Sequence, residues 1–304
     1  MMPSEINIAF LIGPARSGTT MLGYQTLSRH PDIEYWGEPV YLWRRGHVYN
    51  RYDNLNEEDL TSGLRDYLRK KFASKLEKSG KKLLVEKTPS NCFRIKYLQS
   101  VFPEAKFIYV TRDGRDVAHS AMKEWRNEKS ESIDSKSFRK KNILQRLILI
   151  VLRKGKLLER FDRWRAFTEL PYYLFRYFRY LYRTITKKAM VWGPNFQGLS
   201  DFAKKNSLAQ TCAYQWQQSH LQAVKDLGDV PDKKIHRIRY EALIENPRNS
   251  LTELLNFLEI DSSDIIVNNL SGIIKYRKSK ELPSEVLTEM EAQIGETLKT
   301  LGYS

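Results

Sequence analysis

Short apolar runs alternate along the chain with longer segments in which apolar residues recur every three or four positions. Runs of this length, closed by glycine, proline or a charged residue, are typical of strands buried on both faces of a parallel sheet. The pattern predicts five strands, within residues 6–13, 33–39, 81–89, 106–111 and 234–240.

The longer segments have the spacing of helices that pack one face against a core. Helices are predicted within residues 19–30, 56–78, the part of 112–125 that follows a tight turn, 207–227, 247–260 and 283–303. Strands alternating with helices predict an α/β domain with a mostly parallel sheet. Ligands of such sheets bind beyond the carboxyl ends of the strands, so the residues that follow each strand are the first candidates for chemistry.

The composition is that of a globular protein, with 41% hydrophobic and 29% charged residues in a chain of 304. That length is sufficient for a substantial core, and no repeat is visible. We predict one domain over residues 1–304, with 126–195 as a basic, aromatic helical insert or lid. The two cysteines, Cys92 and Cys212, are too few for a disulfide framework and favour a reduced compartment.

The first residues lack the basic and apolar regions of a signal peptide. The longest uninterrupted apolar run, 147–152, is far shorter than the roughly 20 residues that span a bilayer. We therefore expect a cytoplasmic protein, with membrane association through the insert left open.

The positive charge is concentrated in one segment. Residues 136–188 hold sixteen lysines and arginines against three acidic residues, so this segment carries most of the formal net charge of +15. The same segment holds eleven aromatic residues. Three interpretations remain open: a solvated cationic cap over an acceptor pocket, a peripheral membrane or lipid-acceptor surface, and nucleic-acid binding. Because no recognised nucleic-acid-binding fold surrounds the segment, no nucleic acid is expected as a partner.

A glycine-rich loop, Gly13 to Thr20, follows the first strand and opens a helix. Its glycines have the spacing of a Walker A loop, but Thr19 stands where the lysine belongs. Successive backbone N–H groups at a helix start form an anion cradle, and Arg16 and Ser17 add donors. The missing lysine argues against an ATPase or kinase.

A second constellation begins at Arg112, where the fourth strand ends. Ser120 lies eight residues further on, about two turns into the following helix. The pair could bracket a second phosphate at the edge of the sheet, although such a signal is weak by itself.

Three segments taken together resemble the ordered motifs of sulfotransferases that use 3′-phosphoadenosine-5′-phosphosulfate (PAPS). They are PARSGTTML, EKTPSNCFRIKYLQSVFPEAKFIYVTRDGRDVAHS and RIRYEALIENPRNSLTELLNFL. The resemblance covers roughly residues 6–45, 83–125 and 207–260. It is strongest to the branch with tyrosylprotein sulfotransferases and bacterial carbohydrate or lipid sulfotransferases, and it implies a P-loop-like sheet flanked by helices.

The resemblance also implies a role for individual residues. The 5′-phosphosulfate of PAPS would be held by Arg16, Ser17, Gly18, Thr19 and Thr20. The 3′-phosphate would be held by Arg112 and Ser120, with Tyr240 near the nucleotide. The implied reaction is direct transfer of a sulfuryl group to an acceptor hydroxyl, without a metal; a glycan, a lipid or another small molecule would carry that hydroxyl.

Two residues are candidates for the chemistry of transfer. Glu38 lies just past the second strand, and the resemblance implies that a glutamate there acts as general base. Lys87 ends the third strand and matches the lysine aimed at the bridging oxygen, where a cation stabilises the leaving phosphate. Arg16 completes the catalytic set. His47 is the one histidine that rivals Glu38; the others, His30, His119, His220 and His236, are expected to be structural.

Two other functions compete with sulfuryl transfer. One is a small-molecule kinase with a modified P-loop, and the other is a non-catalytic cationic adaptor for membranes or nucleic acid. A late basic cluster, Lys275, Arg277, Lys278 and Lys280, aligns with no family position and is interpreted as a solvated charge run.

Overall fold

The computed structural model describes residues 5–47, 50–131, 192–261 and 282–303. The chain divides into two compact units, one made of residues 1–122 and 193–304 and the other of 123–192. The sheet and the site lie in the first unit. Almost all of the basic insert and the late basic cluster at 275–280 lie outside the described residues, so the expectations for both stay predictions.

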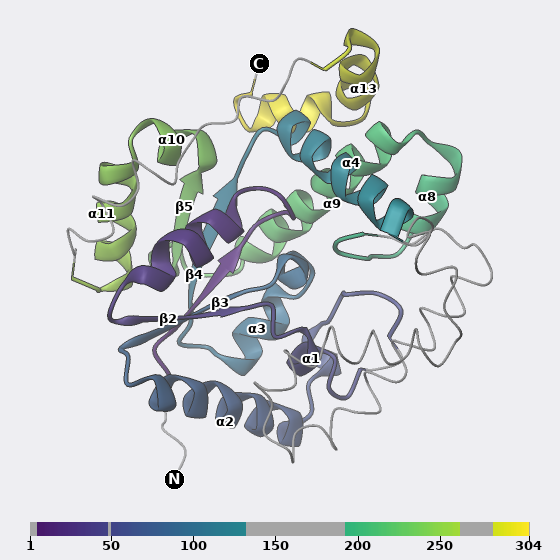
Figure 1. The fold of residues 1–304 in the computed structure, drawn as a ribbon. Coiled ribbons are helices and arrows are strands. Elements are labelled where there is room, and N and C mark those ends of the chain that lie inside the picture. Colours follow the sequence, from purple (N-terminus) through teal and green to yellow (C-terminus); the bar gives the residue numbers. More distant parts are fainter. Residues whose placement is uncertain (1–4, 48–49, 132–191, 262–281, 304) are drawn as a thin grey trace, which may run out of the picture. The chain divides into compact units, whose positions relative to one another are not determined.

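A five-stranded parallel sheet forms the centre of the first unit, and it confirms the predicted fold class (Figure 1). Its strands are β1 (Ile8–Ile12), β2 (Ile33–Gly37), β3 (Leu83–Lys87), β4 (Lys106–Thr111) and β5 (Ile235–Arg239). They are arranged in the order β2-β3-β1-β4-β5. From β1 the chain passes to the edge strand β2, returns to β3 between β2 and β1, and then crosses to β4 and β5 on the other side of β1. The strand order therefore reverses beside β1. Ligands in open α/β sheets bind beyond the carboxyl ends at such a position.

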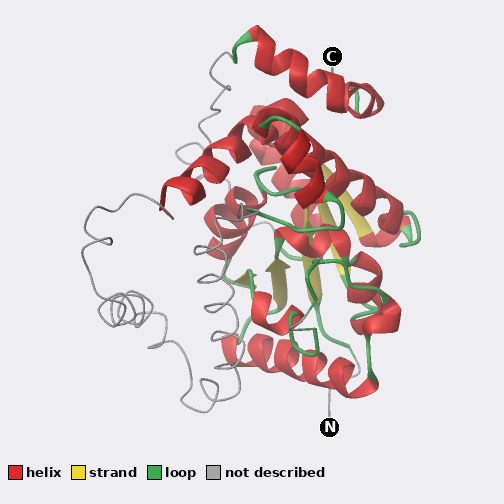
Figure 2. Cartoon of the chain, turned by 90° about the vertical axis from the view of Figure 1, so that its right-hand side faces the viewer, coloured by secondary structure: helices red, strands yellow, loops and turns green. Residues whose placement is uncertain are grey.

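The two faces of the sheet are both apolar, and alternate residues of β1 serve opposite faces. Ala9 and Leu11 belong to a buried cluster that includes residues of three helical segments, η1 (Met21–Thr26), α10 (Tyr240–Glu245) and α11 (Pro247–Leu258). Phe10 points the other way, where its ring packs against Trp43 and Phe72. Those residues belong to α1 (Val40–Trp43) and α2 (Ser62–Ser79). Figure 2 shows helices on both sides of the strands.

Among the described residues, six further helical segments of at least five residues come after β3 in the sequence. They are η4 (Pro89–Phe93), α3 (Ile95–Val101), α4 (Gly114–Glu131), α8 (Leu199–Lys205), α9 (Leu208–Leu227) and α13 (Ser284–Thr300). Helix α9 packs against η4, α3 and α13. It begins at a capping box, in which Ser207 and Gln210 satisfy each other's backbone N–H groups. None of the helices in the described part of the chain is long and apolar enough to cross a membrane.

Two helix predictions need correction. Helix α2 begins at Ser62 rather than near residue 56, because Thr61 caps its first turn and accepts a hydrogen bond from the backbone of Leu64. The predicted helix at 19–30 is helical but wide, since η1 is a π-helix followed by the short 3₁₀ turn η2 (Leu27–Arg29). The Thr26 hydroxyl donates to the carbonyl of Met21, five residues earlier, at 3.1 Å, which suits the wider turn.

Candidate functional site

The candidate residues follow five adjacent parallel strands. Glu38 follows β2, Lys87 ends β3, the glycine-rich loop follows β1, Arg112 follows β4 and Tyr240 follows β5. The register aligns the ends of neighbouring strands, with Gly37 beside Lys87 and Thr111 beside Arg239. Because parallel strands share one carboxyl edge, the sheet brings the residues at the ends of five strands to that edge.

The glycine-rich loop is built to face an anion. Ser17 is fully buried, and its Oγ has no hydrogen-bond partner among the residues that the structure describes. Gly18 has φ +101°, and a Cβ there would lie 2.3 Å from the ring of Tyr240. Arg16 also adopts a positive φ, 76°, which is costly for a residue with a side chain. The loop thus holds a conformation that only its surroundings impose, as is common where a backbone binds a ligand.

Arg16 joins this loop to the second constellation. Its Nε donates to the Ser120 Oγ at 2.9 Å, although 104 residues separate the two. The guanidinium of Arg112 lies 4.2 Å from the centre of the Tyr240 ring and forms an ion pair with Asp116 at 3.2 Å. The buried Nε of Arg112 has no partner in the described part of the chain. The glycine-rich loop and the pair of Arg112 and Ser120 therefore form one continuous cationic stretch of the sheet edge.

Residues that the sequence reasoning missed hold the Arg112 side of this edge. Glu241 accepts the backbone N–H of Asp113 on one carboxylate oxygen and the hydroxyl of Tyr303 on the other, both at 3.0 Å. Burial and the neighbouring Glu241 raise the pKa of Tyr303, so it stays a hydroxyl donor. At Gly114 an added Cβ would lie 2.6 Å from the ring of Trp216, so the start of α4 closely approaches α9. The C-terminal residues thereby fix the turn that carries Arg112.

Glu38 and Lys87 meet at the opposite side. The Lys87 Nζ lies 2.6 Å from the Glu38 Oε1, and the Glu38 backbone N–H donates to the Lys87 carbonyl at 2.8 Å. The lysine side chain is 4% exposed, whereas that of the glutamate is 52% exposed. Glu38 adopts φ 53°, a strained value for glutamate. A buried cation therefore stands beside a carboxylate that an acceptor can reach from solvent.

A buried carboxylate lies next to this pair, and sequence reasoning did not single it out. Glu86 is 0% exposed and accepts hydrogen bonds from three side chains. The Trp43 Nε1 and the Thr88 Oγ1 donate to Oε1 at 3.1 and 2.5 Å, and the Asn91 Nδ2 donates to Oε2 at 2.6 Å. Burial raises the pKa of Glu86 to about 7, and the three hydrogen bonds oppose that rise. The only local signal was its place beside Lys87.

The structure does not bring the rival base to this edge. His47 packs edge-on against Tyr97 at a ring separation of 6.2 Å, and burial lowers its pKa. It lines a hollow beside Arg45 and Tyr67 that includes neither Glu38 nor Lys87. His220 bonds to Tyr109, and burial lowers its pKa to about 4, so it packs as a neutral ring.

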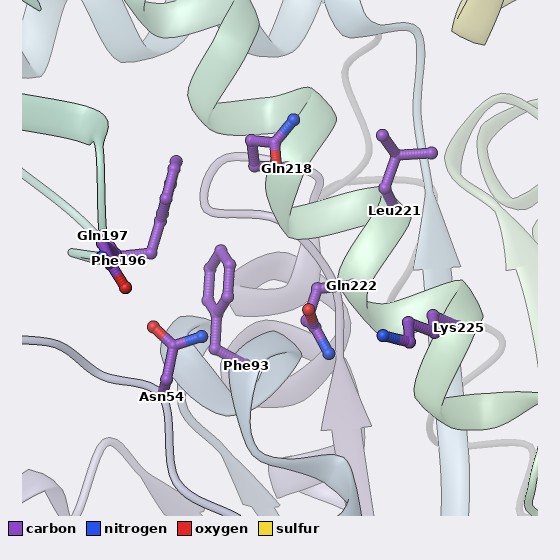
Figure 3. Close-up of a pocket in the computed structure, with 8 residues that line it drawn as sticks. All are labelled: Asn54, Phe93, Phe196, Gln197, Gln218, Leu221, Gln222 and Lys225. Atoms are coloured by element: carbon purple, nitrogen blue, oxygen red, sulfur yellow. The ribbon is translucent and has the colours of Figure 1, made fainter. Parts of the chain in front are cut away.

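A cavity of about 240 Å³ lies between η4, the 193–198 segment and α9. The stacked rings of Phe93 and Phe196 lie on one side of it, and α9 presents Gln218, Leu221 and Gln222 on the other (Figure 3). No residue predicted as part of the site lines this cavity. We therefore place the candidate site at the strand ends, where the candidate residues lie, and not in this cavity.

The residues at the strand ends fit a nucleotide with two separated phosphate groups. The Ser17 Oγ and the Arg112 Nε are buried donors without a partner among the described residues, a kind of group that native proteins almost always pair. Ser17 belongs to the loop after β1, whereas Arg112 follows β4, the neighbouring strand. Anions on these donors match the expected places of the 5′-phosphosulfate and the 3′-phosphate.

Comparison with known proteins decides the family. The sequence model of the sulfotransferase family matches residues 9–153 and 178–264 of the chain. The chain belongs to the sulfotransferase family. This confirms the resemblance drawn from the motifs and extends it, because the match includes parts of the insert at 126–153 and 178–195 that the motifs left outside.

Individual relatives match over a shorter stretch. Nodulation protein NoeE of Sinorhizobium fredii is 32% identical over 133 residues, which are 39% of this chain and 32% of NoeE. Protein-tyrosine sulfotransferase 1 of Danio rerio is 30% identical over 131 residues, 39% of this chain and 36% of that protein. The matched part of the chain thus spans only about a third of either relative.

Among solved structures, the sulfotransferase domain from the curacin biosynthetic pathway has the same fold. It aligns with a TM-score of 0.52 over 99% of both chains, at 16% identity. At that identity the likeness concerns the fold alone, and it agrees with the parallel sheet and flanking helices described above.

Proposed function

We propose that this protein transfers the sulfuryl group of PAPS to a hydroxyl of an acceptor. The observation that carries the proposal is the line of groups along one edge of the sheet. It runs from the exposed carboxylate of Glu38 and the buried cation of Lys87, through the loop around Ser17, to Arg112. Membership of the sulfotransferase family supports the same reaction.

Different groups of the chain would bind the two ends of PAPS. The backbone N–H groups of 16 and 18–20 and the hydroxyls of 17–20 would bind the 5′ end, since the Ser17 N–H already donates to the Pro14 carbonyl at 3.1 Å. Arg112 with Ser120 would bind the 3′-phosphate, beside Tyr240. When bound, PAPS supplies an activated sulfuryl group. Arg16 bonds to Ser120 and shares the loop with Ser17, so its position couples the two ends of the nucleotide.

Glu38 would accept the proton of the acceptor hydroxyl. Lys87 occupies one of its carboxylate oxygens, Oε1, and the half-exposed side chain leaves the carboxylate open to an incoming hydroxyl. Lys87 is almost completely desolvated, so its charge acts at short range with little screening by water. A cation in that place stabilises negative charge that develops on a departing phosphate oxygen.

A glycan, a lipid or another small hydroxyl compound is the acceptor class that we propose. The basic, aromatic composition of the insert suits contact with an anionic acceptor or with a membrane surface. Residues 136–188 fall outside the described part of the chain, so this proposal rests on their composition alone.

Transfer of labelled sulfuryl from PAPS to a panel of carbohydrates, lipids and phenols tests the proposal. Glu38→Gln removes the base and should abolish turnover while the affinity for the product nucleotide, 3′-phosphoadenosine-5′-phosphate (PAP), stays within about twofold. Glu245→Gln, at an exposed glutamate of α10, is the matched control and should behave as the wild type. Full turnover by Glu38→Gln would remove that residue from the mechanism. Thermal stabilisation by ATP and not by PAP would favour the kinase instead.

A further inference from the structure

The pair of Glu38 and Lys87 depends on an unusual backbone. Glu38 has φ 53°, and its carbonyl accepts the N–H of Val40 at 2.7 Å, so it stands at a tight turn into α1. Strain of this kind persists only where the surrounding structure holds it. The elements on both sides of the turn, β2 and α1, must therefore be fixed: Glu86 is paired with Trp36 of β2 in the sheet and accepts a hydrogen bond from Trp43 of α1.

Glu86 connects three elements at a buried point. It belongs to β3 and directly precedes Lys87. Through the Trp43 Nε1 it holds α1, the helix that begins two residues after Glu38. Through the Asn91 Nδ2 it holds η4, which continues the chain beyond Lys87. Both members of the reactive pair are thus tied to one carboxylate.

A carboxylate suits this position because it only accepts hydrogen bonds. In the ionised form its two oxygens receive three donors, and no proton on the side chain competes with them. A buried carboxylate with fewer donors would be costly, so the set of Trp43, Thr88 and Asn91 is required once Glu86 is there. The charged groups that act on Glu86 include the buried guanidinium of Arg94.

We infer that Glu86 is a positioning residue for sulfuryl transfer, which holds α1 and the end of β3 so that Glu38 and Lys87 face each other. The inference rests on the proposed function. Glu86 touches neither donor nor acceptor; it acts through Trp43 and Asn91 on the turn at Glu38 and on the segment after Lys87. Its loss should therefore affect the rate of transfer and spare the nucleotide loop, which belongs to β1.

Trp43→Phe tests the link while an aromatic ring stays in the core. The change removes the indole N–H that Glu86 accepts, and Thr88→Val removes the hydroxyl donor at the same oxygen. The matched control is Phe72→Leu, because Phe72 packs 5.4 Å from the Trp43 ring and has no hydrogen bond to Glu86. All variants are assayed as the full chain, with kcat expressed per PAP-binding site from calorimetric titration.

We expect Trp43→Phe and Thr88→Val each to lower kcat per site by about tenfold or more, since small displacements of reacting groups are expensive. The Kd for PAP should stay within about twofold of the wild-type value, and Phe72→Leu should lose thermal stability without that loss of kcat. Equal losses in Phe72→Leu, or wild-type kcat in both Trp43→Phe and Thr88→Val, would overturn the inference.

Substitution of Glu86 itself supplies a second measurement. In Glu86→Gln the Asn91 amide can turn and offer its Oδ1, which is buried without a partner among the described residues, to the new N–H₂. Glu86→Gln should therefore keep several-fold more kcat per site than Glu86→Leu. Equal values for the two would contradict positioning through hydrogen bonds. A wild-type protein that binds PAP but transfers nothing would instead reject the proposed function and leave the fold of the network intact.

Discussion

Replacement of Arg112 by alanine separates the two phosphate sites most clearly. The Arg112 side chain is 13% exposed, stacks on Tyr240, and has a buried Nε without a partner among the described residues. A hydrogen bond to a charged group contributes about 1.5–3 kcal/mol. Since 1.4 kcal/mol corresponds to a factor of ten, Arg112→Ala should weaken PAP binding by about 10- to 150-fold.

The assay is calorimetric titration of two nucleotides against wild type and Arg112→Ala. Adenosine 5′-monophosphate lacks the 3′-phosphate, so its affinity should be nearly the same for both proteins, and only PAP should lose affinity. Arg237→Ala is the protein-side control, because Arg237 lies on β5 with its side chain 57% exposed, paired with an exposed aspartate. A loss that is equal for the two nucleotides would refute the assignment of Arg112 to the 3′-phosphate.

Three further measurements test the glycine-rich loop, the buried carboxyl of Glu86 and the buried thiol of Cys92. Gly18→Ala combines a positive φ with a Cβ 2.3 Å from Tyr240, and the strain plus the overlap should cost about 2–5 kcal/mol of unfolding free energy, measured by urea titration. The pKa of Glu86 is raised from an ordinary 4.5 to about 7 in the folded state, so the folded protein binds that proton more tightly than the unfolded chain. The stability of the wild type relative to Glu86→Gln should therefore be greatest below pH 4.5 and fall as the pH rises through 7; urea titrations at pH 5 and 8 that show the opposite order would contradict this. Finally, burial raises the pKa of the Cys92 thiol to about 12, so a thiol reagent should leave Cys92 unmodified until the protein unfolds, as mass spectrometry of the labelled peptide would report.

The strands and the edge residues could be predicted from the sequence because both leave local signals. Each apolar run has the length and ending of a buried parallel strand, and Glu38, Lys87 and Arg112 each follow such a run directly. Parallel pairing then places these ends together, as the register of β2 with β3 shows. The parallel sheet thus follows from the pattern, and with it the edge of the sheet that carries the candidate residues.

The contacts that hold the site could not be predicted in the same way. Trp43 and Glu86 are 43 residues apart, and Glu241 and Tyr303 are 62 apart. Hydrogen bonds across such distances depend on the tertiary packing and have no periodic signal. The late start of α2 has a local cause, the Thr61 cap, which competes with an apolar pattern that extends further back.

A crystal structure of the protein with PAP would show directly whether the carboxyl edge of the sheet binds the nucleotide. We expect the 5′-phosphate on the backbone N–H groups of 16 and 18–20, with the Ser17 Oγ as a donor, and the 3′-phosphate on Arg112 and Ser120. Nucleotide bound away from the carboxyl edge of β1 and β4, or with its 3′-phosphate out of reach of Arg112, would contradict it.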